Sequence, residues 1–236
     1  MKPLFILPGW GLGHGPLQAA AAALGGAFID LPGYGETPLE ADFDRAAAAI
    51  AERLPEGSTL AGWSLGAMLA LAVAARAPAK VGKLLLIAGT ASFVQREGWP
   101  DAMPPATLSE FAAAIAADAP AMLPRFVGNF NRGDVRAKAV TAEILRLASP
   151  LPAGDVLATG LGWLRDVDLR IDAPRVTAPT LLLHGAADPL MPLAAAQTLA
   201  ALIPGADLTV LDDCAHAPFL SRPDDFLGHA RAFLHG

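Results

Sequence analysis

Ser64 lies in a sequence setting that favours nucleophilic chemistry. It is the central residue of Gly62-Trp-Ser-Leu-Gly66, which matches the G-x-S-x-G pattern of a nucleophile elbow. In that turn the backbone of the serine is strained, its hydroxyl projects towards substrate, and the flanking glycines avoid a clash with a Cβ. The next N–H, on Leu65, would lie free at a helix N-terminus and could face a developing oxyanion. Because the chain contains 23 glycines, the pattern alone could arise by chance. The apolar run before it and the helical run after it supply the strand–turn–helix context that favours an elbow.

A nucleophilic serine needs a base, and the base needs an acid to orient it. His216 is the preferred base, because it follows the last predicted strand in a loop that can reach Ser64. Asp188, just beyond the end of another apolar strand, is the preferred acid. Asp212 and Asp213 are closer to the histidine in sequence, but it would need a tight reversal to meet them. Structural roles remain as alternatives: a surface histidine and a helix-capping aspartate.

The second oxyanion donor should come from the loop after the first strand. Gly9-Trp10 occupies that place, so the N–H of Trp10 is assigned to act with the N–H of Leu65. The Trp10 ring would line an acyl pocket or fill the core. No Cys/His cluster has the spacing of a zinc site, and we expect neither a metal nor a cofactor.

The elements that must position these residues alternate between short apolar strands and helices. Strands are predicted at 4–7, 27–31, 58–62, 81–88, 179–184 and 208–211, and helices at 16–24, 42–54, 65–76, 193–202 and 224–234. Asp42 is a plausible N-cap for the second of these helices. The alternation indicates an α/β fold with a mostly parallel sheet of about six strands and helices on both faces.

Residues 89–174 break this alternation. They contain clustered prolines, helical stretches at 108–117, 119–126 and 135–147, and no convincing strand. We expect a single domain over residues 1–236, with a core of 1–88 and 175–236 and a helical lid at about 89–174. Such a lid would lie above the carboxyl ends of the strands, where ligands bind in open α/β sheets.

Composition limits the function classes. The chain has 236 residues and a mean hydropathy of +0.42, yet no apolar run approaches the ~20 residues of a spanning helix. The single cysteine, Cys214, excludes an internal disulfide and makes the cytoplasm the expected compartment. A net charge of −6 argues against nucleic-acid binding. We expect a monomer without a membrane or nucleic-acid partner.

One segment departs from this acidic balance. Between residues 125 and 146, two acidic residues stand against five basic ones, namely Arg125, Arg132, Arg136, Lys138 and Arg146. Such a segment is either a solvated helix face or a docking patch for an acidic partner.

The elbow and the order serine, aspartate, histidine resemble the α/β-hydrolase superfamily across essentially the whole chain. Within it, the chain is similar to the pimeloyl-[acyl-carrier-protein] methyl ester esterases of biotin synthesis. The similar stretches are Pro8-Gly-Trp-Gly11, Asp30-Leu-Pro-Gly-Tyr-Gly35, Gly62-Trp-Ser-Leu-Gly66, Arg96-Glu-Gly-Trp-Pro100, Asp166-Val-Asp-Leu-Arg170 and Ala215-His-Ala-Pro-Phe219. Two departures are Pro8-Gly9, where the family commonly has His-Gly, and a start directly at the first strand, which predicts a shorter sheet.

The resemblance implies roles for the residues already singled out. Ser64 would be the nucleophile, His216 the base and Asp188 its orienting acid, with Trp10 and Leu65 framing the oxyanion. Phe126 and Phe130 would line the acyl channel with Trp10. Lid arginines face an acidic carrier protein in that family, and Arg125, Arg132 and Arg136 lie in a comparable place.

The sequence thus predicts a serine carboxylesterase that hydrolyses the methyl ester of a medium-chain acyl group, with pimeloyl-[acyl-carrier-protein] methyl ester as the favoured substrate. One alternative is a general small-molecule ester or lactone hydrolase whose lid shields an apolar pocket. A second is a non-catalytic binding protein with the same fold, which the complete set of Ser64, Asp188 and His216 disfavours.

Overall fold

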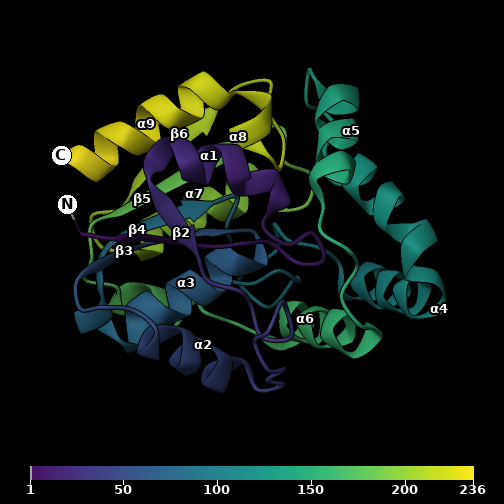
Figure 1. Ribbon diagram of the computed structural model, residues 1–236, viewed down its shortest axis with the longest axis horizontal. Coiled ribbons are helices and arrows are strands. Elements are labelled where there is room, and N and C mark those ends of the chain that lie inside the picture. Colours follow the sequence, from purple (N-terminus) through teal and green to yellow (C-terminus); the bar gives the residue numbers. More distant parts are fainter. Residues whose placement is uncertain (1) are drawn as a thin grey trace.

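A parallel sheet runs through the centre of the computed structural model, which describes residues 2–236 (Figure 1). Its six strands are β1 (Leu4–Leu7), β2 (Gly26–Phe28), β3 (Ser58–Trp63), β4 (Val81–Ile87), β5 (Thr180–Gly185) and β6 (Asp207–Leu211). They lie in the order β2-β1-β3-β4-β5-β6, and every neighbouring pair is parallel. The α/β fold predicted from the sequence is confirmed. β3 and β5 are buried at every position, as strands covered on both faces must be.

Helices cover both faces of the sheet. α1 (Gln18–Leu24) packs with α9 (Pro223–His235) on one face, and α2 (Phe43–Glu52) packs with α3 (Leu65–Arg76) on the other (Figure 1). α7 (Leu193–Leu202) packs against β5 and β6. α3 is buried at every residue except Arg76, which explains its alanine-rich, apolar sequence. Asp42 caps α2 as predicted, because its side chain accepts the N–H of Arg45 at 2.9 Å.

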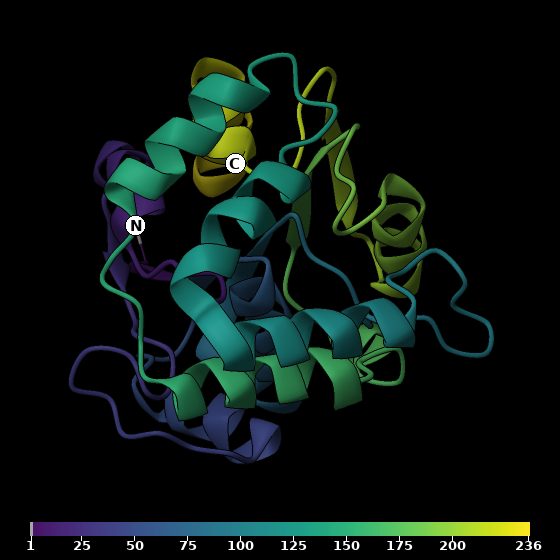
Figure 2. The ribbon, with the colours of Figure 1, turned by 90° about the vertical axis from the view of Figure 1, so that its right-hand side faces the viewer.

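Three helices between β4 and β5 form a layer beyond the carboxyl ends of the strands (Figure 2). We call α4 (Pro105–Phe130), α5 (Ala137–Leu147) and α6 (Gly154–Asp166) the lid helices. The helical backbone of α4 breaks at Asp118 (φ −157°, ψ 79°), whose carboxylate then accepts the N–H of Ala121 at 3.1 Å. The two helices expected on either side of residue 118 therefore form as two arms of α4. Across residues 2–236, the helices lack the combined length and hydropathy needed to cross a bilayer.

α6 is the element that the sequence pattern did not predict. Glycines at 154, 160 and 162 weaken its helical signal. At Gly160 the structure supplies the reason, since a Cβ there would collide with the indole ring of Trp10. The glycine lets α6 approach that ring closely, so a tertiary contact overrides local propensity. Smaller differences are the short helix α8 (Pro218–Ser221) and β2, which ends at Phe28 rather than at Leu31.

Candidate active site

Ser64 occupies a strained turn between β3 and α3. Its backbone lies at φ 58° and ψ −120°, a conformation that non-glycine residues rarely adopt. A Cβ on Gly62 would collide with the carbonyl of Gly66, and a Cβ on Gly66 would collide with the carbonyls of Leu7 and Pro8. Strain of this kind costs of order 1–3 kcal/mol and persists only where the surroundings impose it. The turn thus has the geometry expected of a nucleophile elbow, and close backbone packing requires both glycines.

His216 and Asp188 form a buried pair. Nδ1 of the histidine lies 2.7 Å from Oδ2 of the aspartate, and both side chains are almost completely buried. Oδ1 of Asp188 accepts the N–H groups of Leu190 and Met191 at 2.9 and 3.0 Å. A carboxylate beside Nδ1 selects the tautomer with hydrogen on Nδ1 and leaves Nε2 as the acceptor. The rival aspartates at 212 and 213 are exposed, so the more distant acid makes this contact.

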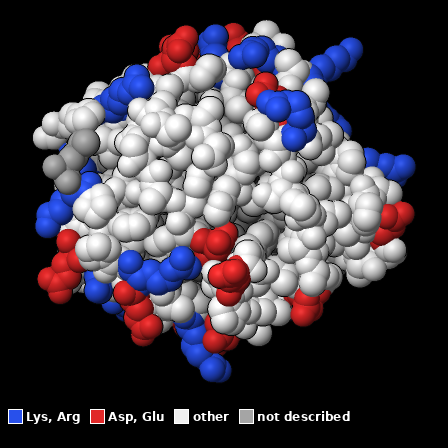
Figure 3. All heavy atoms as spheres, viewed as in Figure 1, with Lys and Arg blue, Asp and Glu red and all other residues white. Residues whose placement is uncertain are grey.

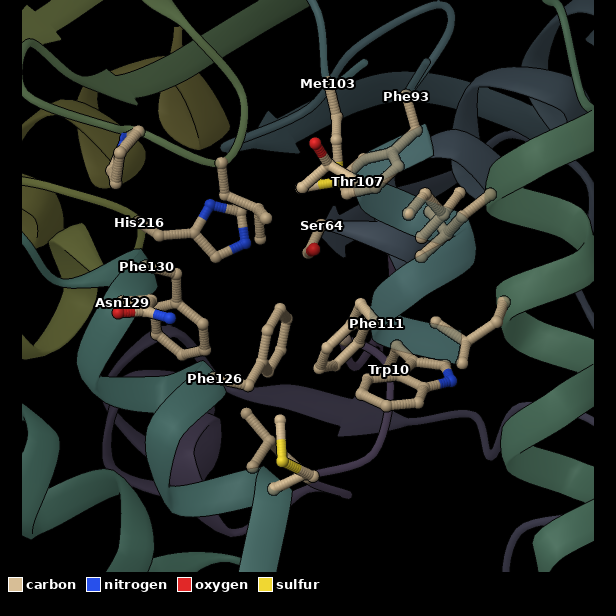
Figure 4. Close-up of a pocket in the computed structure, with 18 of the residues that line it drawn as sticks. Trp10, Ser64, Phe93, Met103, Thr107, Phe111, Phe126, Asn129, Phe130 and His216 are labelled. Atoms are coloured by element: carbon tan, nitrogen blue, oxygen red, sulfur yellow. The ribbon is translucent and has the colours of Figure 1, made fainter. Parts of the chain in front are cut away.

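The His216 ring and the Ser64 hydroxyl face one another across the cavity (Figure 4). Within residues 2–236 the hydroxyl makes no hydrogen bond to the imidazole, a state common in such sites before substrate binds. Ser64, His216 and Asp188 therefore come from three separate loops and converge at one edge of the sheet.

Trp63 contacts the backbone of His216, whereas Asp188 contacts its ring. Its indole N–H donates to the backbone carbonyl of His216 at 2.8 Å. The ring also packs edge-on against Phe130 and Phe219. Trp63, the residue before Ser64, thereby holds the backbone of His216, a contact that no local sequence pattern could reveal.

His184, near the end of β5, is a second buried histidine beside the acid. Its Nε2 lies 2.7 Å from the carbonyl of Met191 and 3.7 Å from Oδ2 of Asp188. Burial lowers its pKa, so the ring is neutral and Nε2 carries the hydrogen donated to Met191. His184 thus supports the loop whose N–H groups hold Asp188. In the sequence, the only indication that His184 lies near Asp188 is that the two residues are four positions apart.

The expected oxyanion donors lie on either side of the elbow. The N–H of Leu65 is at the first position of α3, and neither it nor the N–H of Trp10 takes part in a loop or turn hydrogen bond within residues 2–236. Gly9 packs directly on Trp63 and Ser64, where an added Cβ would lie 3.0 Å from the indole and 3.4 Å from the serine Cβ. The loop that carries Trp10 therefore packs directly against Ser64.

Two side-chain hydrogen bonds anchor this loop. The indole N–H of Trp10 donates to the carbonyl of Leu157 on α6 at 3.0 Å. The N–H of Gly11 donates to the Tyr34 hydroxyl at 2.8 Å. Burial raises the pKa of Tyr34 to about 12, so its hydroxyl stays neutral over the physiological range. Tyr34 was not predicted as a site residue.

A cavity of about 500 Å³ opens beside Ser64, His216 and Trp10 (Figure 4). Its interior is apolar, and Phe111, Phe126 and Phe130 form its aromatic wall. Phe126 packs edge-on against both Trp10 and Phe130. Apart from the buried Ser64 and His216, the polar residues that line it are exposed and therefore lie at its rim, namely Thr107, Glu110, Asn129 and Arg132. The geometry suits an apolar chain with a polar group at its outer end.

The three predicted docking arginines have different surroundings. Arg125 and Arg132 are exposed, and Arg132 also lines the cavity. Arg136 donates to the carbonyls of Leu220 and Ser221 at 3.3 and 3.0 Å, which ties it to the end of α8. Lys and Arg side chains gather over α5 at the upper right of Figure 3. Arg132 donates to Oδ1 of Asn129 at 3.2 Å within its own segment, so within residues 2–236 only Arg136 of the three is hydrogen-bonded to an element outside the lid.

Two of the lid-region stretches singled out in the sequence lie together. Arg170 pairs with Asp168 at 2.7 Å and donates to the carbonyl of Glu97 at 2.6 Å. The hydrogen bond from Arg170 lowers the pKa of Asp168. None of these three residues lines the cavity, and their contacts join the segment before α4 to the segment after α6.

Two other kinds of group could be reactive in residues 2–236: the thiol of Cys214 and clusters of side chains that could bind a metal ion. Burial, together with the charge of Asp134, raises the pKa of the Cys214 thiol to about 12, so it is not a nucleophile at neutral pH. Among residues 2–236, no group of three or more His, Cys, Asp or Glu side chains is placed to hold a metal ion.

Comparison with known proteins gives consistent matches. The model of the alpha/beta hydrolase family matches residues 4–229. The pimeloyl-[acyl-carrier protein] methyl ester esterase of Aromatoleum aromaticum is 40% identical over 240 residues, covering 94% of each chain. The protein of the same name from Nitrosomonas europaea is 36% identical over 235 residues, covering 95% of this chain and 92% of its own.

Solved structures show the same fold at lower identity. An esterase from Exiguobacterium antarcticum superposes with a TM-score of 0.86 at 23% identity, covering 100% of this chain and 92% of that one. The enol-lactonase from Burkholderia xenovorans LB400 superposes with a TM-score of 0.84 at 19% identity, with the same coverage. At these identities the likeness concerns the fold alone.

Proposed function

Since the chain belongs to the alpha/beta hydrolase family, we propose that it is a serine carboxylesterase that hydrolyses the methyl ester of a pimeloyl group carried by an acyl-carrier protein. One observation carries the esterase activity: Ser64, on a strained elbow, faces a histidine whose other ring nitrogen is 2.7 Å from the buried Asp188. The substrate is supported by relatives named pimeloyl-[acyl-carrier protein] methyl ester esterase, which are 30–40% identical to this chain over nearly their whole length.

In the first half of the reaction, His216 Nε2 takes the Ser64 proton while Oγ forms a bond to the ester carbonyl carbon. The N–H groups of Trp10 and Leu65 stabilise the oxyanion, and such donors contribute a few kcal/mol each. Asp188 stabilises the imidazolium through Nδ1. The carbon–methoxy bond then breaks, and His216 donates its proton to the leaving methoxide, which departs as methanol.

In the second half, water enters where methanol left. His216 takes a proton from the water while its oxygen attacks the acyl carbon of the acyl-enzyme. The same two N–H groups hold the second oxyanion. Collapse breaks the bond to Ser64, returns the proton to Oγ and releases the carboxylic acid.

The cavity supports an acyl chain longer than acetyl. Phe111, Phe126 and Phe130 offer an apolar wall, and exposed polar residues surround the rim. A carrier-linked substrate would place its methylenes inside and its carrier outside. Arg125 and Arg132, both exposed, would then attract the acidic carrier surface.

Two measurements test the proposal. Ser64→Ala should abolish hydrolysis of a short p-nitrophenyl ester while circular dichroism shows a preserved fold, and turnover retained by that variant would overturn the serine mechanism. A fluorophosphonate probe that failed to label the unmodified protein would instead favour a non-catalytic binding protein.

A methyl-ester panel tests the substrate. The pimeloyl methyl ester is offered free, and it is offered on an acyl-carrier protein. A kcat/KM at least about tenfold higher for the linked ester, equal to ~1.4 kcal/mol of added binding, supports carrier recognition. Equal values would indicate a general small-molecule esterase or lactone hydrolase.

A further inference from the structure

Residues 131–136, the link between α4 and α5, lie over the loops that carry the acid and the base. We call this segment the lid link. In Figure 2 it runs beside the yellow C-terminal segment. Within it, Gly133 (φ +95°) packs on Ala187, the neighbour of Asp188, where an added Cβ would lie 3.0 Å from the alanine Cβ. Two residues further on, Val135 donates its N–H to the carbonyl of Asp213 at 3.1 Å.

Asp134 is the buried centre of the lid link, at 7% exposure. Its Oδ1 accepts the N–H of Arg136 at 2.6 Å, and its Oδ2 accepts the N–H of Ala215 at 3.1 Å. It forms no ion pair with any residue from 2 to 236. A buried carboxylate is costly unless hydrogen bonds satisfy it, and here backbone N–H groups of two separate elements do so.

Ala215 immediately precedes His216. The same loop is tied to the acid loop, because Ala187 donates its N–H to the carbonyl of Cys214 at 2.9 Å. The backbone of His216 is therefore held by two groups from other elements: Asp134 acts through the preceding N–H, and Trp63 acts on the carbonyl of His216 itself.

We propose that Asp134 is a positioning residue for His216, through which the lid helices set the place of the catalytic base. It touches neither substrate nor the reacting atoms and acts only through the N–H of Ala215. This inference rests on the proposed serine mechanism. It adds that the base is held in place by a lid residue, so the lid contributes to the catalytic step as well as to enclosing the cavity.

The test compares Asp134→Ala and Asp134→Asn with the matched control Asp118→Asn. Asp118 is also a lid aspartate that accepts a backbone N–H, but its contact is local to α4. Asparagine has one acceptor oxygen and cannot accept both N–H groups, so we expect it to keep the shorter contact to Arg136 and lose Ala215.

The activity readout is kcat per titrated serine with p-nitrophenyl acetate, after labelling with a fluorophosphonate counts competent sites. We expect kcat to fall about tenfold in both Asp134 variants, KM to change less than about twofold, and Asp118→Asn to match the wild type. The rate of serine labelling should fall in parallel, because it needs the same base. A purely structural role would lower the midpoint of thermal unfolding and leave kcat per labelled site unchanged.

Hydrogen exchange provides the second measurement. The amide of Ala215 should exchange faster in Asp134→Asn than in the wild type, and unchanged exchange would overturn the proposal. A kcat within about twofold of wild type in Asp134→Asn would also overturn it, even if Asp134→Ala fails to fold. Failure of the wild type to be labelled would instead overturn the serine mechanism, so the two ideas fail separately.

Discussion

The indole N–H of Trp63 donates a 2.8 Å hydrogen bond to the carbonyl of His216, so the residue before Ser64 holds the backbone of the proposed base. This hydrogen bond connects the loop of His216 to the end of β3, directly before Ser64.

Trp63→Phe keeps the aromatic packing and removes this hydrogen bond. We expect kcat to fall about tenfold, because an unpartnered buried carbonyl costs ~1–3 kcal/mol and frees the histidine loop. Trp163→Phe is the control for the loss of an indole hydrogen bond, since Trp163 donates a bond of the same 2.8 Å length to the carbonyl of Ala41 and, unlike Trp63, does not line the cavity. Equal kcat losses in the two variants would contradict a specific role for Trp63.

Gly66→Ala tests the packing of the elbow. A Cβ at residue 66 would enter the carbonyls of Leu7 and Pro8, which are backbone atoms of the sheet and the oxyanion loop. We expect a loss of at least ~3 kcal/mol in the free energy of unfolding, measured by urea denaturation. Gly228→Ala in α9 has open space around the new Cβ and should stabilise by ~0.5–1 kcal/mol. A mild effect at 66 would argue against the tight elbow.

Tyr34→Phe removes the acceptor of the Gly11 N–H and leaves the ring. We expect kcat to fall several-fold with KM nearly unchanged, since the Trp10 loop would hold its oxyanion donor less firmly. Tighter binding of a boronic-acid transition-state analogue to the wild type than to the variant would confirm this. Equal affinities would contradict it.

The same tyrosine predicts a loss of stability at high pH. Its pKa is about 12 in the folded chain against 10.0 in its ordinary state, because burial disfavours the phenolate. The folded form therefore keeps its proton between pH 10 and 12 while the unfolded form releases it. Stability falls over that window by up to ~2.7 kcal/mol. Tyr34 is the single tyrosine of the chain, so absorbance near 295 nm should follow its ionisation directly, and Tyr34→Phe should lose that part of the pH dependence.

Cys214 should resist thiol reagents in the native state. It is fully buried, and its pKa is raised from 9.0 to about 12. At pH 8 a disulfide reagent such as Ellman's should react on the timescale of unfolding, and promptly in urea. Rapid stoichiometric reaction of the native protein would show that the histidine loop opens far more readily than this packing implies.

Charge reversal should separate the arginines. Arg125→Glu and Arg132→Glu should both raise the KM for a carrier-linked ester. In Arg125→Glu the KM for a small free ester should not change. Arg136→Glu should also lower the midpoint of thermal unfolding, because its guanidinium caps the last carbonyls of α8. Identical effects of all three on free and linked esters would count against docking.

Features encoded by neighbouring residues could be predicted from the sequence. The G-x-S-x-G turn at Ser64, the strand preceding Asp188 and the break of α4 at Asp118 all depend on neighbours in the chain. The contact of Asp188 with His216 followed from both residues lying at the carboxyl ends of parallel strands. Their catalytic roles remain proposals.

Contacts between distant segments could not be predicted in this way. The hydroxyl of Tyr34 meets Gly11, and the carboxylate of Asp134 meets Ala215, 81 residues away. Asp134 belongs to no motif, and Tyr34 lies in the Asp30–Gly35 stretch without a contact that its neighbours in sequence could reveal; the burial of both side chains depends on the whole fold. α6 was missed for the same reason. Glycine is needed at 160 because a Cβ would collide with the Trp10 ring, and that contact cannot be inferred from helix propensity.

The close fit of Gly160 against Trp10 also limits how this enzyme could be re-engineered. The indole of Trp10 donates its hydrogen bond to the carbonyl of Leu157 on the same helix, so α6 both belongs to the lid and anchors the loop that carries Trp10. Grafting a foreign lid onto this core would require a glycine at 160 and a helix laid along the same line. Exchange of α4 and α5 alone, with α6 retained, is the more promising route to new acyl specificities.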